Sequence, residues 1–395
     1  MSSGRLECEV LVVGAGPAGS AVAAALAAQG RKVLVVEARQ HPRPKACAEY
    51  ASPRIVEELR HLRVPDAEWL ANARPLAGMR VIRGADAVQI GYQDANGTRT
   101  AWGLDRRTFD AALAAHAVAA GAQLRERSTL EGLFWRDGRV IGAHLRTPEG
   151  PTDVACQVLI GADGARSRVA QLLGVERPVR VPRRLGLVAH YEGIAELTDH
   201  GEMHVGPGWY VGLAPLPGGS LNVGMAVPLD GASRQPAAER FEAAIAGIPA
   251  VAARLAGKRR LTPIRGASPI GHRVSRAAGP GWMLIGDAAG FIDPFTGEGI
   301  YRALRSARAA AEALADGDDG AAERYLAARR GAFAAKDALT WLVQGMLAAP
   351  PLMGYTLRRL AERPSVAARL GSALGDCRPA SDAISPFFLA RVLRP

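Results

Sequence analysis

The sequence has 395 residues, of which 48% are hydrophobic and 22% charged, with a mean hydropathy of +0.02. This composition excludes a disordered or fibrous chain, and the length predicts two intertwined domains or one domain with a large insertion. The net charge is +11, but no basic run is interleaved with aromatic residues. Nucleic acid is therefore not an expected partner, whereas an acidic carrier protein, a phosphorylated cofactor or lipid headgroups stay open.

Cysteine spacing and hydropathy bear on location. The chain has four widely spaced cysteines, Cys8, Cys47, Cys156 and Cys377. None forms a CxxC motif, so we expect no zinc site, no disulfide framework and a cytoplasmic protein. No apolar stretch typical of a signal peptide opens the chain. We expect no transmembrane helix, because Pro350 and Pro351 interrupt the apolar stretch at 341–357.

The first forty residues predict a βαβ unit. An apolar run at 10–13 predicts a strand, an alanine-rich helix follows to about residue 28, and residues 32–37 predict a second strand. Farther on, Ser52 and Pro53 predict a helix start as its N-cap and first position. The opening of the chain is thus typical of a parallel sheet.

The middle of the chain is strand-rich. Alternating residues at 79–82 and 88–92 predict half-buried antiparallel strands. Asp105 predicts the cap of a helix that runs to about residue 119, and a hairpin is expected around the turn at 137–138. Residues 185–227 predict a second set of strands. After a short buried strand at 282–285, helices are expected to the end.

The glycine-rich turn at 14–19 predicts a dinucleotide site. GAGPAG follows a strand and opens a helix, so its glycines permit a tight turn and the helix N-terminus faces a pyrophosphate. Glu37 ends the second strand, at the spacing where a carboxylate accepts hydrogen bonds from an adenosine ribose. The alternative is a glycine turn that serves packing alone.

Two later motifs also follow strands. GADGARS at 161–167 is, by itself, compatible with an ordinary capped turn. In GDAAGFIDPFTGEGI at 286–300, Asp287 can bind ribityl hydroxyls at a strand end. Gly297 and Gly299 let a helix N-terminus approach a ring edge that becomes anionic when reduced. Together these motifs indicate a flavin dinucleotide.

The three motifs, in this order and with DRRTFD at 105–110, resemble the para-hydroxybenzoate hydroxylase superfamily of FAD enzymes. KACAE at 45–49 and the residues at 286–304 are most similar to the geranylgeranyl reductase family. The resemblance implies FAD as cofactor and, since a second GxGxxG is missing, NAD(P)H only as a transient electron donor. The implied FAD contacts are Gly14, Gly16, Pro17, Ala18, Gly19, Glu37, Ala38, Lys45, Arg106, Asp163, Gly286, Asp287, Pro294, Gly297, Glu298, Gly299 and Ile300.

Three residues are candidates for catalysis. The resemblance places Cys47 near the flavin ring; the alternative is a small buried side chain. Trp209 and Tyr210 are candidates for lining the substrate cavity, against the alternative of ordinary sheet packing. Only one of the two faces inward, because neighbours on a strand point to opposite faces. Ala48 stands where the family usually has glycine, and WYVGLAP at 209–215 departs from its aromatic-x-aromatic-x-Phe-Pro strand.

The nucleotide-binding motifs flank the strand-rich block, which predicts an α/β fold with a discontinuous Rossmann-like FAD-binding domain. An antiparallel β-sheet substrate domain is inserted in it, and a C-terminal helical region follows. The predicted boundaries are 1–75, 101–180 and 270–325 for the FAD-binding domain, 76–100 and 181–269 for the substrate domain, and 326–395 for the helical region. His200 and His204 have no third ligand in sight, so no metal site is expected.

The expected activity is that of an FAD-dependent oxidoreductase on a hydrophobic small molecule, which arrives free or on a carrier protein. The resemblance favours reduction of a C=C bond. The alternative is a monooxygenase that hydroxylates an aromatic or polyketide-type intermediate. Gly290 and Glu298 favour the reductase, because related hydroxylases more often carry His and Gln there.

A halogenase is disfavoured by the missing Trp-x-Trp-x-Ile-Pro signature, and a protein that only binds flavin is the non-enzymatic alternative. Peripheral membrane contact through the C-terminal stretch is less favoured than packing of its helices onto the protein. The sequence predicts no particular oligomeric state.

Overall fold

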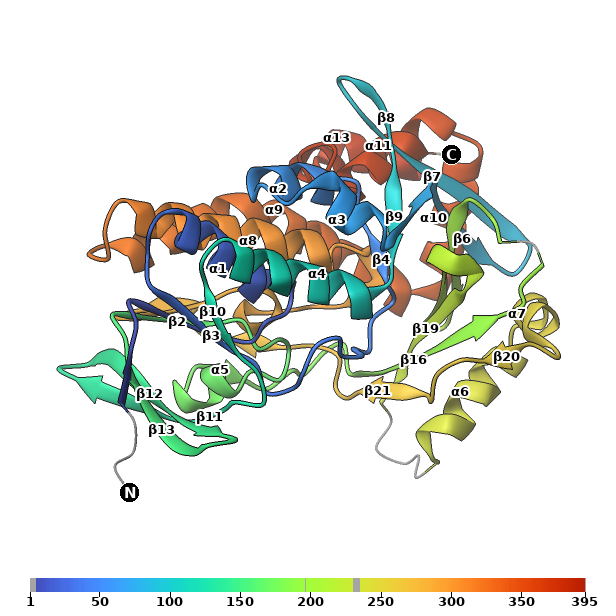
Figure 1. Ribbon diagram of the computed structural model, residues 1–395. Coiled ribbons are helices and arrows are strands. Elements are labelled where there is room, and N and C mark those ends of the chain that lie inside the picture. The colour runs from blue at the N-terminus through green and yellow to red at the C-terminus, as the bar shows by residue number, and fades with distance from the viewer. Residues whose placement is uncertain (1–4, 196, 230–234, 395) are drawn as a thin grey trace.

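The computed structural model describes residues 5–195, 197–229 and 235–394, and its centre is a six-stranded sheet (Figure 1). The strand order is β10-β3-β2-β14-β24-β23, in which only β23 runs antiparallel to its neighbour. The four residues of β2 and of β3 read VLVV and are all buried, as expected for parallel strands covered on both faces. The bounds are β2 Val10–Val13, β3 Val33–Val36, β10 Gln123–Arg125, β14 Val158–Gly161, β23 Ala278–Gly279 and β24 Trp282–Leu284.

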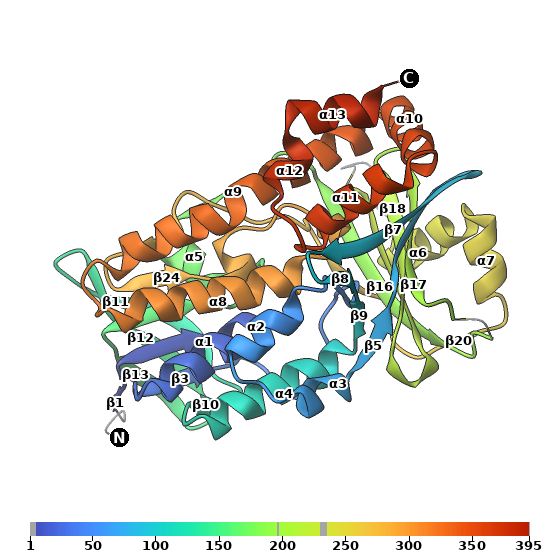
Figure 2. The same ribbon diagram turned by 90° about the horizontal axis from the view of Figure 1, so that it is seen from above.

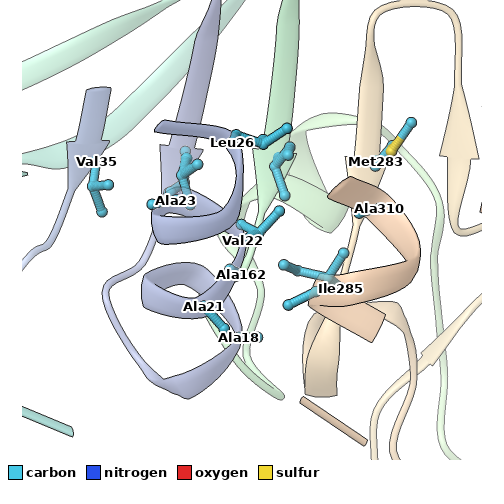
Figure 3. Close-up of a cluster of buried hydrophobic side chains, with 14 of the residues drawn as sticks. Ala18, Ala21, Val22, Ala23, Leu26, Val35, Ala162, Met283, Ile285 and Ala310 are labelled. Carbon is cyan, nitrogen blue, oxygen red and sulfur yellow. The ribbon is translucent and has the colours of Figure 1, made fainter. Parts of the chain in front are cut away.

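Helices α1 (Pro17–Ala28) and α8 (Gly299–Ala315) pack closely beside this sheet. Their shared face consists of small side chains, and Figure 3 shows Ala18, Val22 and Ala310 with Ile285 in this cluster. Small side chains let the two helices approach closely. The hydrophobic core around the central sheet, called the first core below, also receives α4 (Arg106–Ala119), whose cap is the Asp105 side chain, as predicted.

A four-stranded sheet, β1-β13-β12-β11, lies beside the N-terminus (Figure 1). Its hairpin turns at 137–138, as the sequence predicts, because Asp137 and Gly138 both adopt positive φ. The bounds are β1 Arg5–Glu7, β11 Thr129–Arg136, β12 Arg139–Thr147, β13 Gly150–Ala155 and α5 Arg168–Leu172, with the small ladder β15 Glu176–Arg177 and β22 Arg273–Val274.

The largest sheet follows the order β20-β16-β19-β18-β17-β6-β7-β8. Its strands come from 78–99 and 184–267, and β17 pairs with β6 in parallel whereas the other pairs are antiparallel. The bounds are β6 Gly78–Arg83, β7 Asp86–Asp94, β8 Gly97–Arg99, β16 Arg184–Glu192, β17 His200–Gly206, β18 Trp209–Pro215, η1 Pro217–Gly219, β19 Leu221–Pro228, α6 Ala237–Ala246, α7 Pro249–Leu255, β20 Arg259–Arg260 and β21 Arg265–Ala267.

The C-terminal helices α10 and α11 pack against β7 of this sheet (Figure 2), and α13 packs on α10 and α12. The bounds are α9 Ala321–Ala348, α10 Pro350–Ala361, α11 Pro364–Leu374, α12 Ser381–Ile384 and α13 Pro386–Leu393. The helix break at Pro350 confirms the effect expected of that proline. Among the described residues, no helix combines the length and apolarity needed to cross a membrane.

One predicted helix start is wrong. Helix α2 spans Ile55–His61, so it begins two residues after Pro53, the first helical position that Ser52 as N-cap predicts. Ser52 instead begins a turn, in which its carbonyl accepts the Ile55 N–H at 3.3 Å. The neighbouring elements are β4 Tyr50–Ala51, α3 Asp66–Leu70, β5 Ala73–Leu76 and β9 Ala101–Leu104, with η2 Gly286–Ala289 and η3 Pro294–Thr296 leading into α8.

Candidate functional site

The turn between β2 and α1 can be built only from glycine at two positions. Gly14 has φ +101°, and a Cβ there would lie 2.6 Å from the carbonyl oxygen of Ala162 in the neighbouring strand connection. A Cβ on Gly19 would lie 1.8 Å from the Gly14 carbonyl oxygen. Gly16, the N-cap of α1, has no side chain to satisfy the amides of the first turn. These amides therefore remain available to an anionic ligand.

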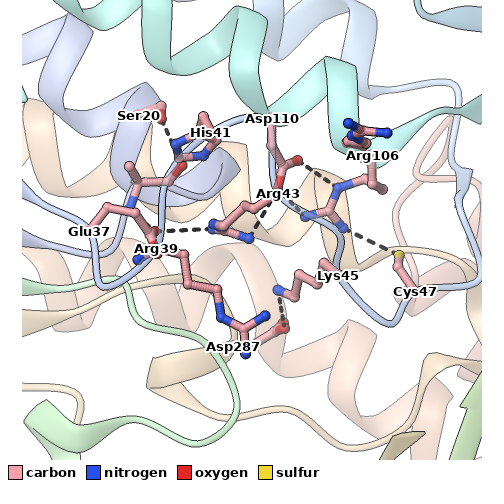
Figure 4. Close-up of polar contacts among 12 residues, drawn as sticks. Ser20, Glu37, Arg39, His41, Arg43, Lys45, Cys47, Arg106, Asp110 and Asp287 are labelled. Carbon is pink, nitrogen blue, oxygen red and sulfur yellow. Dashed lines mark hydrogen bonds and ion pairs between the residues drawn. The ribbon is translucent and has the colours of Figure 1, made fainter. Parts of the chain in front are cut away.

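The Glu37 carboxylate at the end of β3 collects hydrogen-bond donors. Its oxygens accept from the backbone N–H groups of Ala15 and Arg39, both at 3.0 Å. The Arg43 guanidinium completes the set at 3.2 Å (Figure 4). Glu37 is thereby fixed beside the glycine turn, where the sequence predicts contact with a ribose.

The segment that leads from Glu37 to Cys47 carries several cationic side chains. Arg43 lies 3.9 Å from Asp110, and Lys45 Nζ lies 3.9 Å from the Asp287 carboxylate. Figure 4 shows Arg39, Arg43 and Lys45 between the loop and these acids. Two uncapped helix N-termini, those of α1 and α8, add to the positive potential. This donor set fits the pyrophosphate of FAD.

Other predicted cofactor contacts are engaged by the protein. The Asp163 carboxylate accepts from the Ser167 hydroxyl at 2.6 Å and from the Val169 N–H at 3.1 Å, so it holds the start of α5. Burial raises the pKa of Asp163. The Glu298 carboxylate points away into a buried ion cluster with Lys336. Contact of Glu298 with a ligand would have to use its backbone.

The remaining predicted contacts lie in turns, in the loop after β3 and in the first residues of helices. Gly286 and Gly297 have φ +58° and +68°, and Gly299 is the first residue of α8. Ile300 is buried in the first core, whereas Ala38 is exposed. Pro17 and Ala18 begin α1, and Pro294 begins η3. Their contact with FAD stays a prediction.

Cys47 lies against a rigid cation. Arg106 donates to the Cys47 sulfur at 3.3 Å and to both oxygens of Asp110, at 2.7 and 2.9 Å. Burial works against the charge of Arg106, but the attraction of Asp110 and Cys47 outweighs it and raises the pKa of the guanidinium. The Glu49 N–H also donates to this sulfur at 3.4 Å. The sulfur therefore has two donors, unlike a side chain that only fills space.

Sequence reasoning missed three polar residues beside Cys47. The Glu49 carboxylate pairs with His190 Nε2 at 2.6 Å and accepts from Asn222 Nδ2 at 2.9 Å. Asn222 also donates to the Cys47 carbonyl at 2.9 Å. Among the described residues, its buried Oδ1 has no hydrogen-bond partner, so it fits a ligand that donates, as the N–H groups of a flavin ring do. The only local signal in the sequence is Glu49 itself, a carboxylate two residues after Cys47; in the structure it adopts φ +57°.

Trp209 and Tyr210 point to opposite faces of the large sheet. Trp209 packs with the core under α6 and α7. Tyr210 is buried on the other face, where its hydroxyl donates to Asp293 at 2.7 Å and its ring meets Phe295 edge-on. Tyr210 thus contacts the segment that precedes α8. Of the two aromatic candidates, only Tyr210 lies on the side of the predicted flavin site.

The Glu49–His190 pair predicts a pH-dependent stability. Burial alone would lower the pKa of His190, but its bond to Glu49 outweighs burial and raises that pKa above 6.5. The protonated pair therefore stabilises the folded state fully below the unfolded-state pKa, and this contribution is lost as pH rises through the folded-state pKa. Urea unfolding across this pH window should show the loss in the parent protein and a smaller one in Glu49→Gln. Equal losses would contradict the pairing.

Comparisons with known proteins agree with this geometry. The family model described as "FAD binding domain" matches residues 7–330. The chain is 35% identical over 332 residues to a menaquinone reductase of Mycolicibacterium smegmatis, covering 78% of this chain and 76% of the relative. It is 32% identical over 325 residues to a digeranylgeranylglycerophospholipid reductase of Methanothrix thermoacetophila, covering 79% and 78%.

A solved structure supports the same assignment. A geranylgeranyl bacteriochlorophyll reductase-like protein of Thermoplasma acidophilum superimposes with a TM-score of 0.79 at 25% identity, covering 99% of this chain and 96% of that protein. The fold is therefore the mixed α/β fold of FAD-dependent oxidoreductases, and FAD is the cofactor. Its glycine turn, its donor-rich loop and these matches show that the chain belongs to the FAD binding domain family, within the geranylgeranyl reductase group of FAD-dependent oxidoreductases.

Proposed function

We propose that the protein reduces a C=C bond of a hydrophobic, isoprenoid-type lipid, with electrons from NAD(P)H or another donor. The names of the relatives, a menaquinone reductase and a digeranylgeranylglycerophospholipid reductase, support this substrate class. The observation that carries the proposal is the cluster of Cys47, Arg106, Glu49 and His190. It lies where the predicted flavin loop meets the large sheet.

The cluster can supply the proton that the reaction needs besides the hydride. When bound and reduced by the electron donor, FAD would supply the hydride, and saturation of a C=C bond requires one further proton. His190 holds a proton at Nε2 next to Glu49, and Asn222 orients that carboxylate. Arg106 fixes the Cys47 sulfur at the other end of the cluster. In this scheme His190, or Cys47 in its thiol form, gives the proton, and Tyr210 borders the substrate.

The proposal includes a division of the chain into domains. The strands of the central sheet come from both sides of the segments that form the large sheet. This supports a discontinuous FAD-binding domain at 1–75, 101–180 and 270–325, with the substrate domain at 76–100 and 181–269 and the helical region at 326–395. We place the enzyme in the cytoplasm, where its lipid substrate arrives free, on a carrier or from a membrane surface.

Anaerobic reduction followed by rapid mixing with oxygen tests the activity. With a polyprenyl substrate present, the reductase should oxidise its flavin anaerobically and give a product with two more hydrogens per reduced bond, detected by mass spectrometry. A product that gains one oxygen atom, formed only after oxygen is added, would instead support the monooxygenase. Flavin that binds but never turns over with any substrate would contradict both.

Cys47 is the first residue to replace. We expect Cys47→Ala to lower kcat at least about tenfold at unchanged FAD content, because the contribution of a positioned proton donor is typically larger than that. The matched control is Cys8→Ala, since Cys8 is also a partly buried thiol but lies beside the N-terminal strand. Full turnover in Cys47→Ala would remove the thiol from the mechanism and leave His190 as the donor.

A further inference from the structure

A cavity lies outside the predicted FAD-binding loops described above. It has a volume of about 590 Å³ and is bounded by α9, by residues 272–277 and by residues 289–292. None of Gly14, Glu37, Arg43, Lys45 or Asp287 lines it. The volume falls within the range of about 300–1,000 Å³ that small-molecule sites occupy.

The walls of this cavity are strongly basic. Six basic residues line it against one acid, Asp337, and that acid is already paired with Arg302 at 2.7 Å. Within the described ranges, Arg273, Arg329 and Arg330 form no ion pair with a carboxylate. The basic lining residues are His272, Arg273, Arg276, Arg302, Arg329 and Arg330.

Arg329 is held in place but only partly satisfied. It donates to the Ala289 carbonyl at 2.9 Å, and its guanidinium lies 5.8 Å from the centre of the Phe333 ring. Arg302 lies 4.6 Å from the same ring centre. Among the described residues, the buried Nε of Arg329 has no hydrogen-bond partner. Two arginines are therefore oriented in advance at a wall that carries excess positive charge.

The same cavity offers apolar surface. The Val181 side chain, 70% exposed, and the Trp341 side chain, 44% exposed, both line it, as does Phe291. An apolar or aromatic group can cover these side chains while an anion meets the arginines. Several guanidinium forks with no carboxylate partner suit a phosphate, which accepts many hydrogen bonds at once.

We propose that this cavity binds a phosphate ester whose body is apolar or aromatic. A prenyl phosphate and a phosphorylated nucleotide share this chemistry. The site goes beyond the proposed reaction and does not depend on it, because binding alone reports it. Residues 289–292 directly follow the predicted ribityl-binding segment, so the bound ester would lie next to the cofactor loop.

Calorimetric titration of the FAD-loaded protein tests the proposal with four probes: farnesyl diphosphate, farnesol, pyrophosphate and adenosine 2′,5′-bisphosphate. We expect an ester to bind more tightly than both pyrophosphate and farnesol. The double variant Arg273→Glu/Arg330→Glu should weaken that binding at least about tenfold, since it replaces two charge-assisted donors with carboxylates that repel the phosphate. The control Arg136→Glu/Arg378→Glu makes the same change in net charge at two exposed arginines outside the cavity.

A third variant separates charge from space. Ala334→Trp fills the cavity from α9 without a change in charge and should weaken the same ester. Preference for farnesyl diphosphate identifies a lipid source, and preference for the adenosine bisphosphate identifies a nucleotide source. Equal affinities in the parent, the double variant and Ala334→Trp would overturn the proposal, as would a failure of both esters to bind the parent.

Discussion

Gly14→Ala is expected to yield a protein that purifies without bound FAD. The new Cβ would lie 2.6 Å from the Ala162 carbonyl oxygen, a distance that real Cβ atoms essentially never show, so the turn or the neighbouring strand connection must move. The residue would also adopt φ +101°, which costs on the order of 1–3 kcal/mol for a residue other than glycine. Both effects displace the amides at the start of α1. The flavin absorbance per protein, measured after gel filtration, should fall at least about tenfold, since a shift of 1.4 kcal/mol corresponds to that factor in binding.

Gly30→Ala is the matched control for this variant. Gly30 has φ +84° at the other end of α1, but a Cβ added there would have no atom within 4 Å. It thus carries the backbone strain without the collision. We expect Gly30→Ala to lose some stability and to keep its FAD. A Gly14→Ala protein that retains the parental flavin content would refute the role assigned to this turn.

Lys336→Met should cost the protein about 3–5 kcal/mol of unfolding free energy, the usual effect of removing one partner from a buried ion pair. The Lys336 ammonium lies 2.7 Å from Asp376 and 3.1 Å from Glu298, and all three side chains are at most 5% exposed. Its removal leaves the buried Asp376 carboxylate without its cation, and Glu298 keeps only Arg302, at 3.5 Å. Burial already raises the pKa of Asp376, and the lost cation will raise it further. Urea denaturation measures the change.

Two further variants test the cause of this loss. Lys258→Met removes a lysine that is only partly buried and forms no ion pair among the described residues, and it should change stability by less than about 0.5 kcal/mol. Adding Asp376→Asn to Lys336→Met should recover part of the loss, because it removes one stranded charge. A Lys336→Met protein as stable as its parent would show that the cluster does not hold Glu298. We expect Lys336→Met to lower FAD affinity as well as stability, because Glu298 directly precedes α8.

Much of the fold could be predicted because its signals are local. The VLVV runs of β2 and β3, the glycines between them and the Asp105 cap all act within a few residues of each other. The start of α2 could not be placed in this way. Ser52 is buried in the folded protein, and its turn replaces the cap that the local sequence favours.

Only part of the site could be predicted from the sequence. Its glycine motifs are contiguous, but the partners of Cys47 are not: Glu49 meets His190 across 141 residues and Asn222 across 173. Alternation along a strand shows that only one of Trp209 and Tyr210 faces the site. Which of them does so depends on the hydrogen bond that the Tyr210 hydroxyl donates to the Asp293 carboxylate, and Asp293 lies 83 residues farther along the chain.

Helix α9 couples the unfolding of two hydrophobic cores. It runs for 28 residues, roughly 42 Å at the rise of an α-helix. Tyr325 near its start belongs to the core around the central sheet, whereas Leu339, Val343 and Leu347 belong to the core under the C-terminal helices. Neither core can melt without exposing apolar surface on a helix that the other core also needs. Heat should therefore dismantle both cores in one cooperative transition, and large movements within the native protein fall to the loops rather than to either core.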